Sequence, residues 1–122
     1  MPGFPVGANT FNNNGNAVPS DVVVNVQTIT GDGAVTIKSG IVILSKGSAA
    51  AITIAVPDQD GQVLFIVTST AQAHVITQAT DGFNAKGSSG TCTYTAAVGN
   101  AVTLVSQGGH WWATTKTGVT LA

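Results

Sequence analysis

The sequence contains neither arginine nor glutamate, and only 7% of its 122 residues are charged. Its positive charges are lysines that lie far apart along the chain: Lys38, Lys46, Lys86 and Lys116. A protein that binds nucleic acid needs a cluster of positive side chains that contacts the phosphates. Because these lysines form no such cluster, we expect no nucleic-acid partner.

Cysteine is nearly absent as well. Cys92 is the only one in the chain, which excludes an internal disulfide and a CxxC metal or redox site. The alternation in "TCTYT" predicts that this cysteine is a small buried or half-buried residue. A zinc site needs several nitrogen or sulfur ligands, so we expect no metal. Sharing of His74 or His110 by subunits around a threefold axis stays open as an alternative.

Long apolar segments are also missing. The longest runs, such as "AAAITIAV", fall well short of the roughly 20 residues of a membrane-spanning helix. The N-terminus has no basic segment followed by an apolar run, so we expect neither a secretion signal nor a membrane partner. A mean hydropathy of +0.33 with so few charges predicts that sister subunits or a larger assembly cover much of the surface.

The chain divides into two parts that differ in composition and periodicity. Residues 1–20 contain glycines, prolines and the run "NNNGN" without any periodicity, which predicts an extended, flexible N-terminal arm. From residue 21 to residue 122, short β-branched runs alternate with turn-forming residues, which is typical of one all-β domain. The expected strands are 22–29, 34–38, 41–45, 51–56, 62–69, 73–79, 91–96, 101–107, 110–116 and 119–122.

This number of strands predicts a compact β-sandwich, a jelly-roll-like domain or a β-barrel, with about nine or ten short strands joined by tight turns as in a meander. Alternation assigns the faces of several strands: Val75 and Thr77 lie opposite His74, Ile76 and Gln78. Residues 63–67 are all apolar, so this strand is expected to be covered on both faces, either centrally in the domain or by a subunit interface. Neighbouring side chains of a strand point in opposite directions. One of the adjacent residues Trp111 and Trp112 is therefore expected in the core and the other outside.

The sequence offers little for catalysis. No GxSxG nucleophile motif is present, and "KGSSGT" does not match it. Asp58 and Asp60 form the only close carboxylate pair, in "VPDQDGQV", which lacks the first ligand and the final glutamate of a calcium loop. We interpret this segment as a hairpin turn with Pro57 at its start and Gly61 in the left-handed conformation. We therefore expect no catalytic, cofactor-binding or metal-binding residues, and no enzymatic activity.

A set of ordered motifs in residues 60–122 resembles a group of small bacteriophage structural proteins of the head-decoration or cement type. The pattern comprises an Asp-Gly turn, an I-x-x-x-T-type strand, an A-H-x-[IV]-T strand, a loop with F-N and glycines, and A-x-G-x-x-x-T-L-x-x-x-x-G-x-W before a closing T-L strand. In this chain these are Asp60-Gly61, Ile66 to Thr70, Ala73 to Thr77, Phe83-Asn84, Ala97 to Leu104, and Gly109 with Trp111 and Trp112. The pattern has one aromatic residue where this chain has two tryptophans.

The resemblance implies a non-enzymatic virion protein that sits as a homotrimer on the outer surface of the head, binds the lattice of the major capsid protein and stabilises it. It would be made in the bacterial cytoplasm. We expect the arm to contact the lattice through Phe4, Val6, Phe11 and Val18. We expect the subunit interface to contain Val63, Phe65 and Val67, together with His74 and one of Trp111 and Trp112.

A module of a tail fibre or spike that binds a host receptor or glycan is the alternative. It would use the exposed tryptophan and the loop "DGFNAKGSSG", in which Asp81 and Asn84 supply polar groups. Glycan sites commonly place such groups around an aromatic ring.

Overall fold

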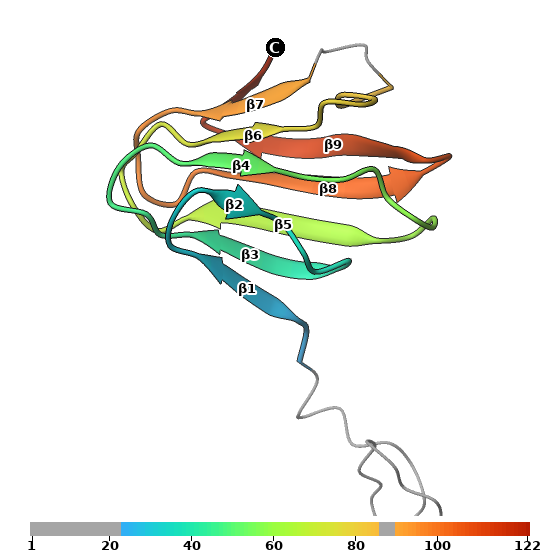
Figure 1. Ribbon diagram of the computed structural model, residues 1–122, viewed down its shortest axis with the longest axis horizontal. Helices are drawn as coiled ribbons and strands as arrows, with labels where there is room; N and C mark the ends of the chain where they lie inside the picture. The colour runs from blue at the N-terminus through green and yellow to red at the C-terminus, as the bar shows by residue number, and fades with distance from the viewer. Residues whose placement is uncertain (1–22, 86–89) are drawn as a thin grey trace, which may run out of the picture.

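Ten short strands and no helix form the part of the chain that the computed structural model describes, residues 23–85 and 90–122 (Figure 1). The strands form two five-stranded sheets that pack against each other as the layers of a sandwich. The predicted all-β sandwich is therefore confirmed. Each sheet keeps two open edges, so the barrel alternative does not apply.

The first sheet has β5 at its centre. In spatial order it contains β1 (Val26–Ile29), β3 (Gly40–Leu44), β5 (Val63–Thr68), β8 (Ala101–Gln107) and β9 (His110–Thr117). β1, β3 and β5 pair in parallel, whereas β8 and β9 are antiparallel additions.

The second sheet is built from shorter strands. In spatial order it contains β10 (Val119–Leu121), β7 (Thr91–Tyr94), β6 (Val75–Thr77), β4 (Ala51–Thr53) and β2 (Gly33–Ala34). β2, β4 and β6 are again parallel, and β7 and β10 are antiparallel. Both sheets are thus mixed in the same way.

The first six strands alternate between the two sheets, so the chain winds as a short parallel solenoid, with each coil contributing one strand to each layer. Groups 24 residues apart meet between the last two coils. The amide of Ala50 donates to Nδ1 of His74 at 3.0 Å, and Nε2 of Gln78 donates to the carbonyl of Ile54 at 3.0 Å. The antiparallel strands β7 to β10 then close one end of the solenoid.

This winding corrects the predicted meander or jelly-roll connections. The turn around Pro57 does place Gly61 at a positive φ of 84°, as expected. However, it leads from β4 in one sheet to β5 in the other and therefore forms no hairpin. A tight hairpin joins β8 to β9, where Gly108 and Gly109 have φ values of 64° and 80°. Several strands are also shorter than expected, because residues such as 35–38 and 54–56 cross between the layers.

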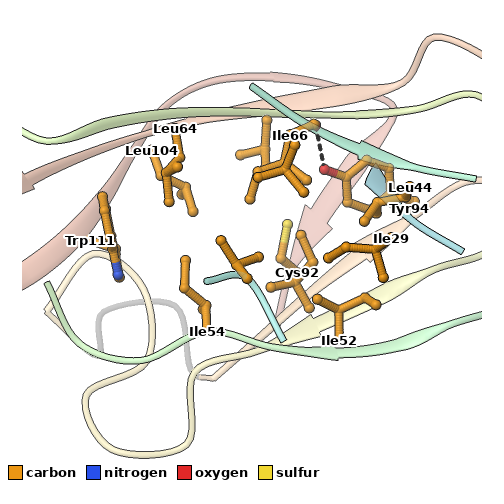
Figure 2. Packing of buried hydrophobic residues seen from close by; sticks show 14 of the residues in the cluster. Ile29, Leu44, Ile52, Ile54, Leu64, Ile66, Cys92, Tyr94, Leu104 and Trp111 are labelled. Atoms are coloured by element: carbon orange, nitrogen blue, oxygen red, sulfur yellow. Dashed lines mark hydrogen bonds between the residues drawn. The ribbon is translucent and has the colours of Figure 1, made fainter. Parts of the chain in front are cut away.

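The core fills the space between the sheets with branched aliphatic side chains from both layers (Figure 2). Tyr94 crosses this space, and its hydroxyl donates to the carbonyl of Ile66 in the opposite sheet at 2.6 Å. Trp111 lies at one end of the core, where its Nε1 donates to the carbonyl of Ala55 at 2.8 Å. These two hydrogen bonds tie the layers together at separate points, because each joins a side chain of one sheet to the other side of the core.

Candidate interaction surface

The surface of the first sheet that faces away from the core is apolar, and we call it the outer apolar face. Cross-strand register aligns its side chains in rows, for example Val26, Ile41 and Phe65 on β1, β3 and β5. Its apolar side chains are Val26, Ile41, Ile43, Val63, Phe65, Val67, Val105 and Trp112, and the threonines Thr28, Thr103 and Thr115 lie among them.

The middle strand β5 exposes two large side chains on this face. Leu64 and Ile66 are fully buried in the core, while Val63 and Phe65 on the other side are 42% and 40% exposed. Val67 lies on the same side and is partly exposed. The strand is central in its sheet, and among the described residues only one of its faces is covered, by the core, so the expected cover of its second face stays a prediction. The sequence "VLFIV" therefore supplies one apolar surface to the core and another to the outside.

The two tryptophans divide between these surfaces as alternation predicts. Trp111 is 3% exposed and belongs to the core cluster. Trp112 lies opposite Val105 on the outer apolar face and is partly exposed, with its Nε1 donating to the carbonyl of Gln107 at 3.0 Å. Of the two, Trp112 is the residue that a partner can reach.

Charge is absent from this face. Among the described strands of the first sheet, Lys116 is the only charged residue, and its cross-strand partner is the buried Val102, which places it at a core-side position.

The lysine–aspartate ion pairs lie in loops instead. Lys46 Nζ is 2.8 Å from Asp32 Oδ1, and its hydrogen bond is the main reason that the pKa of Asp32 is below its usual value. The pKa of Asp58 is lowered as well, mainly by a hydrogen bond from Gln62 and to a smaller extent by one from Lys38.

His74, which we expected at a subunit interface, lies inside the chain's own core. It is fully buried, its Nδ1 accepts from the amide of Ala50, and its Nε2 is 2.9 Å from the hydroxyl of Thr70. That hydroxyl in turn lies 2.8 Å from the carbonyl of Lys46 and donates to it, so Nε2 carries the proton that bonds to Thr70. Both ring nitrogens are used, which leaves no group of His74 for a partner or a metal.

Only some of the residues expected to bind a glycan lie close to one another. Asp81 Oδ2 lies 3.8 Å from Nδ1 of His110, and the His110 ring packs edge-on against Trp112 with centroids 6.1 Å apart. Nδ1 of His110 is buried without a hydrogen-bond partner. The Asn84 side chain, in contrast, accepts from the amide of Ala113 at 2.8 Å and so holds its loop against β9.

Other candidate chemistry finds little support in this part of the chain. Burial raises the pKa of the Cys92 thiol to about 12, so the thiol stays protonated, and its predicted burial is confirmed. A cavity of about 20 Å³ beside Trp111 and Gln62 has room for about one water molecule. Within residues 23–85 and 90–122 no group of three His, Cys or Asp side chains could hold a metal, and no helix is suited to spanning a membrane.

Sequence reasoning missed the part of the outer apolar face that lies on β1, β3 and β8. Ile41, Ile43 and Val105 alternate with buried residues just as Val63 and Phe65 do. Their alternation was visible, but their alignment beside β5 depends on the strand pairing, in which β3 lies parallel and β8 antiparallel to β5. The predicted arm residues Phe4, Val6, Phe11 and Val18 lie outside the described residues, so the structure offers no placement for them.

The comparisons with known proteins leave the family open. No protein-family model matches the chain, and no curated protein matches it significantly. The outer apolar face and the motif resemblance of residues 60–122 therefore carry the functional interpretation.

Proposed function

We propose that this chain is a non-enzymatic structural protein of a bacteriophage virion, a homotrimeric decoration protein that binds the assembled head and stabilises it. The observation that carries the proposal is the outer apolar face, a charge-free sheet surface whose central strand exposes Val63 and Phe65. Monomeric soluble proteins rarely leave such a continuous apolar surface open to water. The motif resemblance of residues 60–122 supports the virion setting.

In the proposed trimer, three copies turn their outer apolar faces toward a shared threefold axis. Each face then contacts both neighbours, so the side chains of β5 pack into a common apolar core. Burying a valine or phenylalanine side chain contributes about 1.5–3 kcal/mol, so a few such residues from each copy suffice for stable association. The loop charges of Asp32, Lys46, Lys38 and Asp58 stay at the periphery in this arrangement.

Stabilisation of the head follows from mass action. A protein that binds the assembled lattice but not the free capsid subunits shifts the equilibrium toward the lattice, by an amount that grows with the logarithm of its free concentration relative to its Kd. Many copies on one head act together, because every bound trimer adds its own contribution. No reaction is needed for this role.

The test combines a mass measurement with a binding measurement. Light scattering of the purified full chain is expected to give a trimer, and sedimentation with empty phage heads is expected to bring the protein down with expanded heads. Phe65→Thr removes apolar area from the face and is expected to weaken trimer formation by at least about tenfold. Thr53→Ser, on the exposed side of β4 in the second sheet, is the matched control and should leave both results unchanged. A monomer that does not sediment with the heads would contradict the proposal.

A glycan- or receptor-binding module of a tail fibre or spike is the second candidate. The observation that favours it is the cluster of Asp81, His110 and Trp112, which sets a carboxylate and an imidazole ring beside a partly exposed indole. Sugar hydroxyls bind such polar groups while the sugar ring stacks on the aromatic face. A glycan array on the wild type, Trp112→Ala and Asp81→Asn tests it: loss of a wild-type signal in both variants would favour this function over head decoration.

A further inference from the structure

The open edge of β1 presents backbone groups that lack partners within the described residues. The carbonyls of Asn25 and Ile29 accept hydrogen bonds from the amides of Ile41 and Ser45 on the β3 side. Backbone groups of successive strand residues point in opposite directions within the sheet plane. The N–H and C=O groups of Val24, Val26 and Thr28 therefore point away from β3, toward the free edge.

The side chains along this edge are exposed and uncharged. Val23, Val24 and Val26 are 86%, 56% and 57% exposed, which are three of the four highest values among the large apolar residues of the described chain. Asn25, Gln27 and Thr28 complete the segment without a charge or a proline. An exposed, uncharged edge of this kind readily pairs with another strand.

The other sheet edges carry the protection that β1 lacks. On β9, the loop at Phe83 and Asn84 covers the start of the strand, a register irregularity interrupts its pairing with β8, and Lys116 adds a charge near its end. β2 has two residues and β10 has three, too few for a long ladder. Proteins use such covers, bulges, lysines and short edges to prevent strand addition. The absence of these features from β1 indicates that its edge is covered in the functional assembly.

We propose that the β1 edge pairs with the β1 edge of a second copy of this chain, antiparallel and around a twofold axis centred on Val26. In this register Val26 exchanges both backbone hydrogen bonds with its counterpart, and Val24 does so with Thr28 of the second copy. The edge is self-complementary, because each copy offers the same donors and acceptors at the same spacing. The two first sheets then form one continuous sheet with a joined outer apolar face.

This pairing is separate from the proposed threefold contact. It uses backbone groups at the edge of the first sheet, whereas the trimer would use side chains of β5 on its face. On a capsid surface it would link neighbouring trimers, but it requires neither a trimer nor a capsid. A chain has one β1 edge, so the pairing doubles the mass of a monomer, whereas a trimer has three such edges and associates further.

The experiment compares two substitutions of the same residue in the full chain. Val26→Pro removes an N–H that points to the free edge, while the hydrogen bond from Ile41 to the Asn25 carbonyl stays in place; proline is tolerated at such edge positions. Val26→Thr keeps the N–H and serves as the matched control. Sedimentation velocity over a concentration series should show at least about tenfold weaker doubling for Val26→Pro and a change of no more than about threefold for Val26→Thr. Thermal melting of both variants confirms that they fold.

A second measurement needs no substitution. Hydrogen exchange of the wild type should slow at the amides of Val24, Val26 and Thr28 as the protein concentration rises, because pairing removes them from water. Equal doubling of the wild type and Val26→Pro, together with concentration-independent exchange at these amides, would overturn the proposal. Doubling that begins only after residues 1–20 are deleted would also overturn it, because the chain's own N-terminal segment would then be the occupant of the edge. Phe65→Thr should leave doubling intact, which separates this contact from the trimer.

Discussion

At the scale of single residues, His74 shows how a polar group is retained in an apolar core. Its two ring nitrogens are both hydrogen-bonded, one to the amide of Ala50 and one to the hydroxyl of Thr70. Burial, with a smaller effect from the charge of Lys46, lowers the pKa of His74 below its ordinary value of 6.5. The neutral ring therefore connects the last two coils of the solenoid, because Ala50 and His74 lie in successive coils.

Acidification should destabilise the fold through this residue. Below about pH 6.5 the unfolded chain binds a proton at His74 that the folded chain excludes, so the free energy of unfolding falls by up to about 1.4 kcal/mol per pH unit. Above that pH both states are neutral at this position and stability does not depend on it. Urea unfolding at intervals between about pH 7.5 and about pH 5 measures the slope.

His74→Gln is the control for this prediction, because it removes the ionisable ring. The variant should be less stable at every pH, since a glutamine cannot reproduce both hydrogen bonds. Its remaining slope between about pH 6.5 and pH 5 should be clearly smaller than that of the wild type. An identical slope in the two proteins would assign the acid sensitivity to other groups.

At the scale of elements, close contact between coils constrains particular glycines. Gly40 begins β3 with a φ of 131°, and a Cβ placed there would lie 2.2 Å from the backbone oxygen of Asn25. That oxygen is held by its hydrogen bond from Ile41, so it cannot move aside without loss of a ladder bond. The glycine therefore allows β1 and β3 to approach where the parallel pairing starts.

Gly40→Ala should lower the free energy of unfolding by about 3 kcal/mol, because it combines an unfavourable backbone conformation with a clash against the main chain. Gly33→Ala is the matched control, since an added Cβ at that position meets no atom within 4 Å. We expect this control to stay within about 0.5 kcal/mol of the wild type. Chemical denaturation of the three proteins provides the comparison, and equal stability of both variants would contradict the tight approach.

The extent of individual elements was harder to predict than their existence. Alternation correctly assigned the faces of β6, and the runs at β6 and β8 became strands. The segment 34–38, in contrast, yields only β2 (Gly33–Ala34), because the chain leaves the second sheet there to begin the next coil. Val35 and Ile37 are then buried or half-buried as part of the crossing, so their apolar character reflects the core and not a ladder. Local pattern does not distinguish these situations.

At the scale of the whole molecule, stability should vary from the centre to the edges. β5 and β8 each have a neighbouring strand on both sides, whereas β1 and β2 form the open end of the solenoid. Native-state hydrogen exchange should therefore show the slowest amides in β5 and β8 and faster exchange in β1 and β2, at low protein concentration. Uniform protection across all strands would indicate a single opening unit and contradict this gradient.

Some properties of this protein follow from the sequence by itself. The all-β class, the burial of Cys92, the opposite orientations of Trp111 and Trp112, and the second apolar side of residues 63–67 all follow from composition and from the period of two along a strand, which is a local property. The parallel winding of β1 to β6, the outer apolar face, the core position of His74 and the exposed β1 edge were decided by the tertiary structure. They depend on which strands pair and in which register, and those pairings join residues 15 to 24 positions apart along the parallel strands. Turn residues mark where a strand ends, but they do not show which sheet the next strand joins.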